Sequence, residues 1–123
     1  LRTLFCFIIG NGDMHLKNWS LISDRDGNYY LSPCYDLICS KIYLPGEDES
    51  ALTINGKRNI ITGLDFTRLA EYLKIDKKAY SNVFFRLGEL KQVFIEMISG
   101  DEHFNMKDRM KEVLLERYGS LRM

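Results

Sequence analysis

The carboxyl-terminal half of the sequence constrains the fold most, because its apolar residues recur at helical spacing almost to the last residue. The recurrence begins behind Asp65, a candidate helix N-cap. Residues 77–98 predict one long helix or two abutting helices, and a last helix is predicted to start near Asn105, with Asp108 placed as in a capping box. The apolar positions expected to form the core are Phe66, Leu69, Ala70, Leu73, Tyr80, Val83, Phe84, Leu87, Phe94, Ile95, Ile98, Met106, Met110, Val113, Leu114, Tyr118 and Leu121.

The first ten residues predict one further buried element. Residues 1–9 are apolar on nearly every side and are followed by Gly10, a pattern typical of a buried helix with a glycine at its carboxyl end. A buried strand is the alternative, because short apolar runs do not distinguish the two.

Two hairpins are predicted between these helical regions. Residues 18–22 and 28–33 flank the turn dipeptide Asp26-Gly27, and residues 51–54 and 57–61 flank Asn55-Gly56. The expected fold class is therefore mainly α, one helical bundle with short β-hairpins near its amino end.

Charge and cysteine content exclude several classes of protein. Lys and Arg together number 17, as do Asp and Glu, so the positive excess that direct nucleic-acid binding needs is absent. Three widely spaced cysteines make no disulfide framework, and no CxxC pair points to zinc. The apolar run at residues 4–9 is too short to cross a bilayer, so we expect no membrane association and a reducing cytoplasm.

A polar stretch at residues 11–18, "NGDMHLKN", carries the chemistry. Asp13 and Asn18 have the Asp-x-x-x-x-Asn spacing of a kinase catalytic loop, in which the carboxylate orients a hydroxyl and the amide oxygen can bind Mg²⁺. Asp36 follows the first predicted hairpin, where a second metal-binding carboxylate is expected. A turn residue for Asp13, a strand cap for Asn18 and a helix N-cap for Asp36 are the structural alternatives.

The segments "NGDMHLKNWSLI", "LSPCYDLICSKIYLP" and "ALTINGKRN" together resemble the carboxyl-terminal lobe of HipA-type serine/threonine toxin kinases. The resemblance covers most of the chain and implies a bundle like a kinase C-lobe. It implies that Asp13 is the catalytic base and that Asn18 and Asp36 bind Mg²⁺ with ATP. His15 and Lys17 would line the same loop as catalytic residues. Lys17 would contact the phosphate charge, and His15 would also contact the cofactor. For His15, a loop-shaping hydrogen bond is the alternative, because this chemistry needs no imidazole.

The resemblance also implies what to expect beyond the catalytic loop. Residues 1–123 contain no Gly-rich phosphate loop and no nucleotide-anchoring lysine ahead of the catalytic loop, so we expect them to be a C-lobe whose nucleotide-binding N-lobe lies upstream or on another chain. The isolated chain is then expected to have little kinase activity. The family's substrates are aminoacyl-tRNA synthetases, and its partner is a HipB-like DNA-binding antitoxin, which would make any DNA contact indirect.

Two other functions remain open. Asp13-x-His15-x-x-Asn18 also resembles the D-x-H-x-x-N loop of aminoglycoside and choline kinases, so the acceptor could be a small molecule or lipid. A catalytically silent interaction domain with a kinase fold is the third reading, although such a module has no need for a base and two metal ligands.

Overall fold

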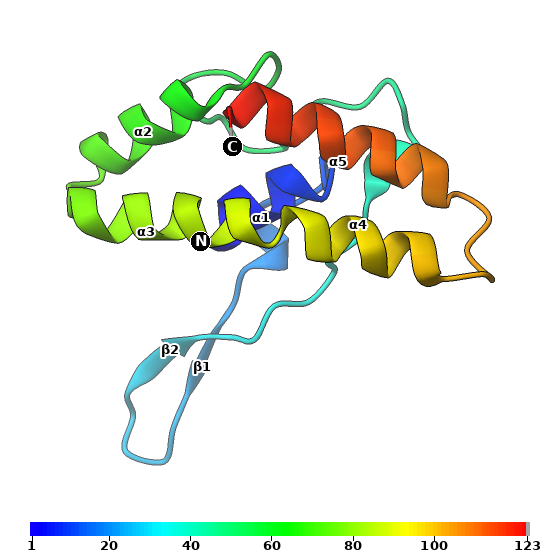
Figure 1. Ribbon diagram of the computed structural model, residues 1–123. Coiled ribbons are helices and arrows are strands. Elements are labelled where there is room, and N and C mark those ends of the chain that lie inside the picture. Colours follow the sequence, from blue (N-terminus) through cyan, green and yellow to red (C-terminus); the bar gives the residue numbers. More distant parts are fainter. Residues whose placement is uncertain (123) are drawn as a thin grey trace.

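The computed structural model describes residues 1–122 and confirms a mainly helical fold with one small antiparallel sheet near the amino end. Five α-helices and two 3₁₀ turns account for most of the regular structure of these residues (Figure 1). In chain order the elements are α1 (Arg2–Ile8), η1 (Leu16–Asn18), β1 (Leu21–Ser23), β2 (Tyr29–Leu31), η2 (Ser40–Ile42), α2 (Gly63–Tyr72), α3 (Lys77–Glu89), α4 (Lys91–Gly100) and α5 (Lys107–Leu121).

Helix α1 lies in the middle of the helical body, between α5 on one side and the α3–α4 pair on the other (Figure 1). Its apolar sequence is explained by this position, because a helix covered on most sides needs apolar residues around its circumference. Phe7 and Ile8 are almost completely buried, and Phe7 meets the ring of Phe66 edge to face at 5.3 Å between centroids. The predicted buried helix is therefore confirmed, and the strand alternative is wrong.

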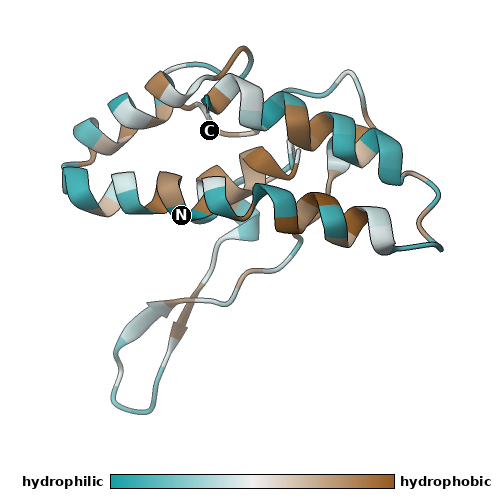
Figure 2. Ribbon diagram, in the orientation of Figure 1, coloured by the Kyte–Doolittle hydropathy of each residue, from teal (hydrophilic) through white to brown (hydrophobic). Residues whose placement is uncertain are grey.

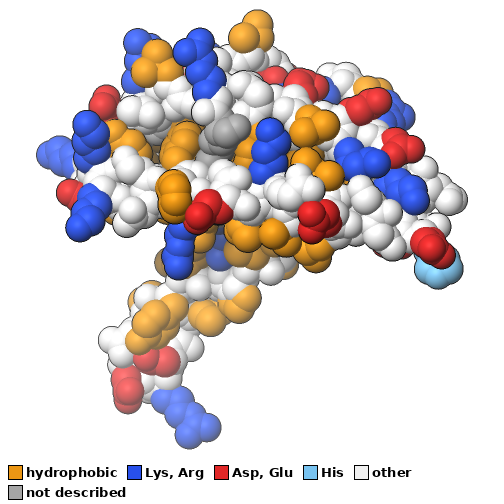
Figure 3. Space-filling view, viewed as in Figure 1, with side chains coloured by type: hydrophobic (Ala, Val, Ile, Leu, Met, Phe, Trp, Pro, Cys, Tyr) orange, Lys and Arg blue, Asp and Glu red, His pale blue; other side chains and the backbone are white. Residues whose placement is uncertain are grey.

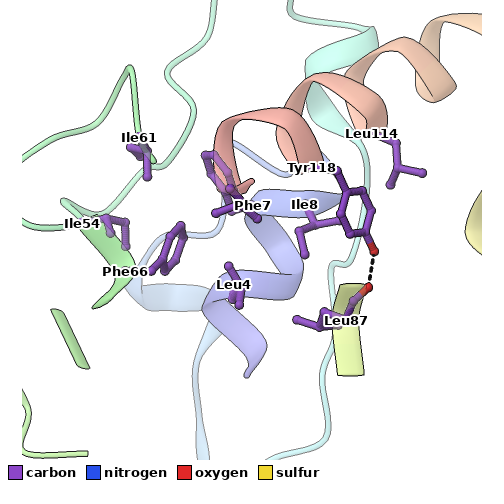
Figure 4. Close-up of a cluster of buried hydrophobic side chains, with 10 residues drawn as sticks. Leu4, Phe7, Ile8, Ile54, Ile61, Phe66, Leu87, Leu114 and Tyr118 are labelled. Carbon is purple, nitrogen blue, oxygen red and sulfur yellow. Dashed lines mark hydrogen bonds between the residues drawn. The ribbon is translucent and has the colours of Figure 1, made fainter. Parts of the chain in front are cut away.

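The main core gathers residues from four helices and from the loop before α2 (Figure 4). Tyr118 of α5 has no exposed surface, and its hydroxyl donates a 2.6 Å hydrogen bond to the carbonyl of Leu87 in α3. Burying an aromatic ring while its hydroxyl is paired avoids the cost of an unsatisfied polar group. The buried members of this core are Leu4, Phe7, Ile8, Ile54, Ile61, Phe66, Leu87, Leu114, Tyr118 and Leu121.

The helix boundaries decide one alternative of the sequence prediction and correct two other details. Residues 77–98 form two helices that meet at Leu90, which is the two-helix alternative. Helix α2 begins after Thr62, and Asp65 is not the N-cap but the third helical residue, whose carboxylate accepts hydrogen bonds from Thr62 in a capping box. Helix α5 begins after Met106 without a side-chain cap, so the capping box predicted at Asn105 is wrong.

The first predicted hairpin is confirmed and the second is mostly wrong. Strands β1 and β2 pair antiparallel with Ile22 opposite Tyr30, and the hairpin projects away from the helical body (Figure 1). At the second position, Asn55 and Gly56 adopt the positive φ angles of a type I′ turn, but the only pairing there is an isolated bridge between Ile54 and Lys57. The flanking residues are used instead to cover the core.

Within residues 1–122, none of the helices combines the length and the hydrophobicity that crossing a lipid bilayer would require.

Candidate active site

The polar stretch at residues 11–18 forms a loop that leaves the carboxyl end of α1. The chain turns at Gly10, whose φ of +72° is a conformation that favours glycine, and Asn11 N–H bonds back to the carbonyl of Cys6. The loop then closes in the short turn η1, which ends at Asn18. Because α1 is buried on most sides, this loop starts from a fixed point of the core.

Asn18 and Asp36 are in direct contact, although 18 residues separate them. The Nδ2 of Asn18 donates a 2.7 Å hydrogen bond to Oδ2 of Asp36, and Asn18 is 5% exposed. Asp36 has a φ of +56° and lies in irregular backbone, so its alternative as a helix N-cap is wrong. The hydroxyl of Tyr35 donates to the carbonyl of Lys17 at 2.9 Å, which ties the two segments together a second time.

Asn11 links the catalytic loop to the Asp36 segment, a role the sequence analysis did not assign. Its Nδ2 donates to the carbonyl of Asp36 at 2.9 Å, and its Oδ1 accepts from the N–H of Asp13 at 3.1 Å. The side chain is 2% exposed, so both ends of the amide are paired in a buried setting. The signal in the sequence was a polar residue directly after an apolar helix, which by itself does not indicate a bridging amide.

The remaining predicted residues lie on the same loop but are not drawn into this contact. Asp13 has an exposed side chain, and its carbonyl accepts a hydrogen bond from the N–H of His15. His15 is half-buried, and its Nδ1 is buried with no hydrogen-bond partner among residues 1–122. Lys17 is exposed, and the contact it makes with Tyr35 uses its backbone. Only the backbone N–H of Asp13 is linked to Asp36, through the side chain of Asn11, which bonds to the backbone carbonyl of Asp36.

The Asn18–Asp36 pair suits a small hard cation. Mg²⁺ prefers oxygen ligands and takes only one or two carboxylates from protein, keeping water and phosphate oxygens as its other ligands. Since Nδ2 of Asn18 is the atom that bonds to Oδ2 of Asp36, the side-chain oxygens left for a cation are Oδ1 of Asn18 and the carboxylate oxygens of Asp36. In the part of the chain that the structure describes, no group of three or more His, Cys, Asp or Glu side chains could hold a metal ion. A cation at this pair would therefore complete its coordination from water or phosphate.

Two relatives among curated proteins carry kinase names. A protein of Sinorhizobium fredii named "Putative kinase Y4dM" is 52% identical over 54 residues, which are 44% of this chain and 13% of the relative. A protein of Haemophilus influenzae named "Putative kinase" is 22% identical over 123 residues, which cover 95% of this chain and 34% of the relative. The chain thus spans about a third or less of the length of these relatives.

The family profile described as the HipA-like C-terminal domain matches residues 1–94, from α1 through the first part of α4. The matched range contains the loop at 11–18, the hairpin, Asp36 and the core residues contributed by α1, α2 and α3. This agrees with the resemblance found in the sequence motifs and with the kinase names of the relatives. The chain belongs to the HipA-like C-terminal domain family.

Proposed function

We propose that this chain is the catalytic C-lobe of an ATP- and Mg²⁺-dependent serine/threonine protein kinase. The observation that carries the proposal is the 2.7 Å contact between Asn18 and Asp36 together with the bridge that Asn11 makes to Asp13. These contacts support a site in which Asp13 would act as the base and Asn18 and Asp36 would bind the metal, as phosphoryl transfer requires.

In this proposal Asp13 acts on the acceptor. Its exposed carboxylate orients the acceptor hydroxyl and takes the hydroxyl proton as the new O–P bond forms and the bond to the leaving ADP breaks. Asn18 and Asp36 would hold Mg²⁺, which supplies charge neutralisation for the phosphates when bound. Exposed Lys17 would add positive charge near the phosphates, while half-buried His15 would shape the loop and line the cofactor side.

The remaining assignments extend the resemblance. The proposed protein substrate is an aminoacyl-tRNA synthetase, and the proposed regulator is a HipB-like antitoxin through which any DNA contact would be made. The neutral net charge supports indirect contact with DNA. A nucleotide-binding N-lobe, on the same chain or another, would complete a cytoplasmic enzyme of which residues 1–123 form one domain. Without it the chain would have little or no activity.

Substitution of two site residues, Asp36 and Asp13, in the complete kinase tests the proposal. Asp36→Ala should abolish Mg²⁺-dependent ATP binding measured by calorimetry, because it removes the only carboxylate of the pair. Asp13→Asn should leave ATP binding intact and lower phosphoryl transfer by about 10²–10⁴-fold, the usual contribution of a general base. Asp26→Asn, an exposed carboxylate in the hairpin turn, is the matched control and should behave as wild type. Unchanged nucleotide affinity in Asp36→Ala would refute the metal assignment and favour a silent interaction domain.

A small-molecule or lipid kinase is the second candidate, favoured by the Asp13-x-His15-x-x-Asn18 spacing on an exposed loop. Radiolabelled ATP offered together with a protein acceptor and with choline or an aminoglycoside distinguishes the two. Transfer to the small alcohol alone would select this second candidate.

A further inference from the structure

The backbone of the catalytic loop is held from a second side, by the segment that follows Asp36. Ser40, the first residue of η2, is 3% exposed, and its Oγ accepts a 2.9 Å hydrogen bond from the N–H of Gly12. The same hydroxyl donates to Oε1 of Glu47 at 2.6 Å. The carbonyl of Gly10 lies farther from the same Oγ, at 3.4 Å, so Glu47 is the closer of two acceptors for the single proton of this hydroxyl.

Glycine at position 12 permits this contact. A Cβ at Gly12 would lie 2.3 Å from the carbonyl oxygen of Asp48 and 2.7 Å from the carboxyl carbon of Glu47. No side chain fits in that space, and the obstacle includes backbone that cannot rotate away. The loop residue next to Asp13 therefore lies directly against residues 47–48.

The segment that carries Glu47 is itself folded tightly. Lys41 N–H bonds to the carbonyl of Gly10, and the Lys41 ammonium donates to the carbonyl of Glu47 at 3.0 Å. The N–H groups of Tyr43 and Leu44 both bond to the carbonyl of Ser40. Residues 40–47 thus form a closed turn anchored on the end of α1, and Glu47 is presented to Ser40 by that turn.

We infer that Ser40 and Glu47 are positioning residues that fix the Gly12–Asp13 backbone and so set the rate of phosphoryl transfer. The inference rests on the proposed function, because it acts through Asp13. We call the hydrogen bonds from Gly12 N–H to Ser40 and from Ser40 to Glu47 the clamp. The clamp is separate from the contacts of the proposed metal ligands, which depend on Asn11, Asn18 and Tyr35. Loosening it should therefore change turnover and leave nucleotide and Mg²⁺ binding alone.

The test compares two variants of Glu47 in the complete kinase. Glu47→Ala removes the closer acceptor for Ser40 and should lower kcat at least about tenfold, because a displacement near 1 Å in a catalytic group can cost up to about 10²-fold. The KM for ATP and the Mg²⁺ concentration for half-maximal activity should stay within about twofold of wild type. Glu47→Gln keeps an oxygen acceptor and should restore most of kcat.

Asp48→Asn is the matched control, because that neighbouring carboxylate bonds to Asn59 and faces Arg58 and not Ser40. It should leave kcat unchanged. Amide hydrogen exchange at Gly12, followed by NMR, reads the clamp without activity, and its protection should fall in Glu47→Ala and persist in Glu47→Gln.

Three outcomes would overturn the inference. Unchanged Gly12 protection in Glu47→Ala would show that the clamp does not hold the loop, whatever the activity. A rise in KM for ATP that matches the loss of kcat would place the effect on binding. Wild-type kcat in Glu47→Ala, while Asp13→Asn is inactive, would refute the inference and leave the proposed function intact; an active Asp13→Asn would refute both.

Discussion

The helical body and the β1–β2 hairpin use apolar residues in opposite ways. In the body, Ile8, Ile61 and Tyr118 are at most 1% exposed, and apolar colour marks α1 at the centre as well as stretches of α4 and α5 (Figure 2). In the hairpin, every residue of both strands is exposed, and five of the six are large and apolar. In the space-filling view, hydrophobic side chains lie on the part of the projecting hairpin nearer the body, and charged side chains lie at its tip (Figure 3).

The difference shows that a run of apolar residues in the sequence does not by itself tell whether those side chains are buried and stabilise the fold. The body gains stability from burial, which contributes about 25 cal/mol per Å² of apolar surface. The hairpin is organised mainly by its turn, where the carboxylate of Asp24 accepts hydrogen bonds from the N–H of Asp26, from Asn28 and from the Tyr30 hydroxyl. An isolated two-stranded hairpin is marginally stable in water, so we expect it to open independently of the body.

The largest expected effect compares two isoleucines. Ile8→Ala removes a side chain with no exposed surface and should lower the free energy of unfolding by about 2–5 kcal/mol. Ile22→Ala in β1, where the side chain is 50% exposed, should cost less than about 1 kcal/mol. Urea unfolding followed by circular dichroism measures both. Equal losses would mean that the hairpin belongs to the same cooperative unit as the body.

A smaller effect is expected at Asp65, the buried carboxylate of the body. Burial by itself raises its pKa, but hydrogen bonds from Asn55, Lys57 and Thr62 outweigh burial and lower the pKa well below its usual range. Asp65→Ala should cost about 1–3 kcal/mol, because it removes a hydrogen-bonded partner from each of these groups. Urea titration at neutral pH gives this value.

The lowered pKa of Asp65 also fixes the direction of a pH effect. Its folded-state pKa lies below the unfolded value of about 4, so its contribution is complete above that pH and is lost as the pH falls toward the folded-state pKa. The stability difference between wild type and Asp65→Asn should therefore shrink below about pH 4. The same difference at pH 3 and pH 7 would contradict this assignment.

The smallest effect on global stability is expected at the hairpin turn. Gly27 has a φ of +81° and open space around its Cα, so Gly27→Ala strains the backbone without a clash. The change should increase hydrogen exchange at hairpin amides such as Asp24 N–H and leave the urea midpoint of the body within error. A shift of the global midpoint as large as that of Ile8→Ala would show that the hairpin and the body unfold together.

The sequence by itself was enough for features decided by near neighbours. Helical periodicity placed the helices after Thr62, and an apolar run followed by Gly10 indicated α1, with a strand as the alternative. The Asp26-Gly27 and Asn55-Gly56 dipeptides marked turns that the structure contains. The family resemblance came from the motif at residues 11–18 taken together with the segments around Asp36 and around Asn55-Gly56, and the family profile matches residues 1–94. The sequence could not show that Thr62, and not Asp65, is the N-cap of α2, because both residue types are good N-caps.

Only the tertiary structure decided the contacts between distant segments. The bridge from Asn11 to Asp36 joins residues 25 apart, and the bond from Gly12 to Ser40 joins residues 28 apart. The residues around Asn55-Gly56 were predicted to pair as strands, yet Ile54 and Ile61 are buried in the core instead. Local sequence sets the backbone preferences of each segment, but the partner of a polar or apolar group depends on which surfaces packing brings together, and burial then favours the arrangement in which those groups are paired.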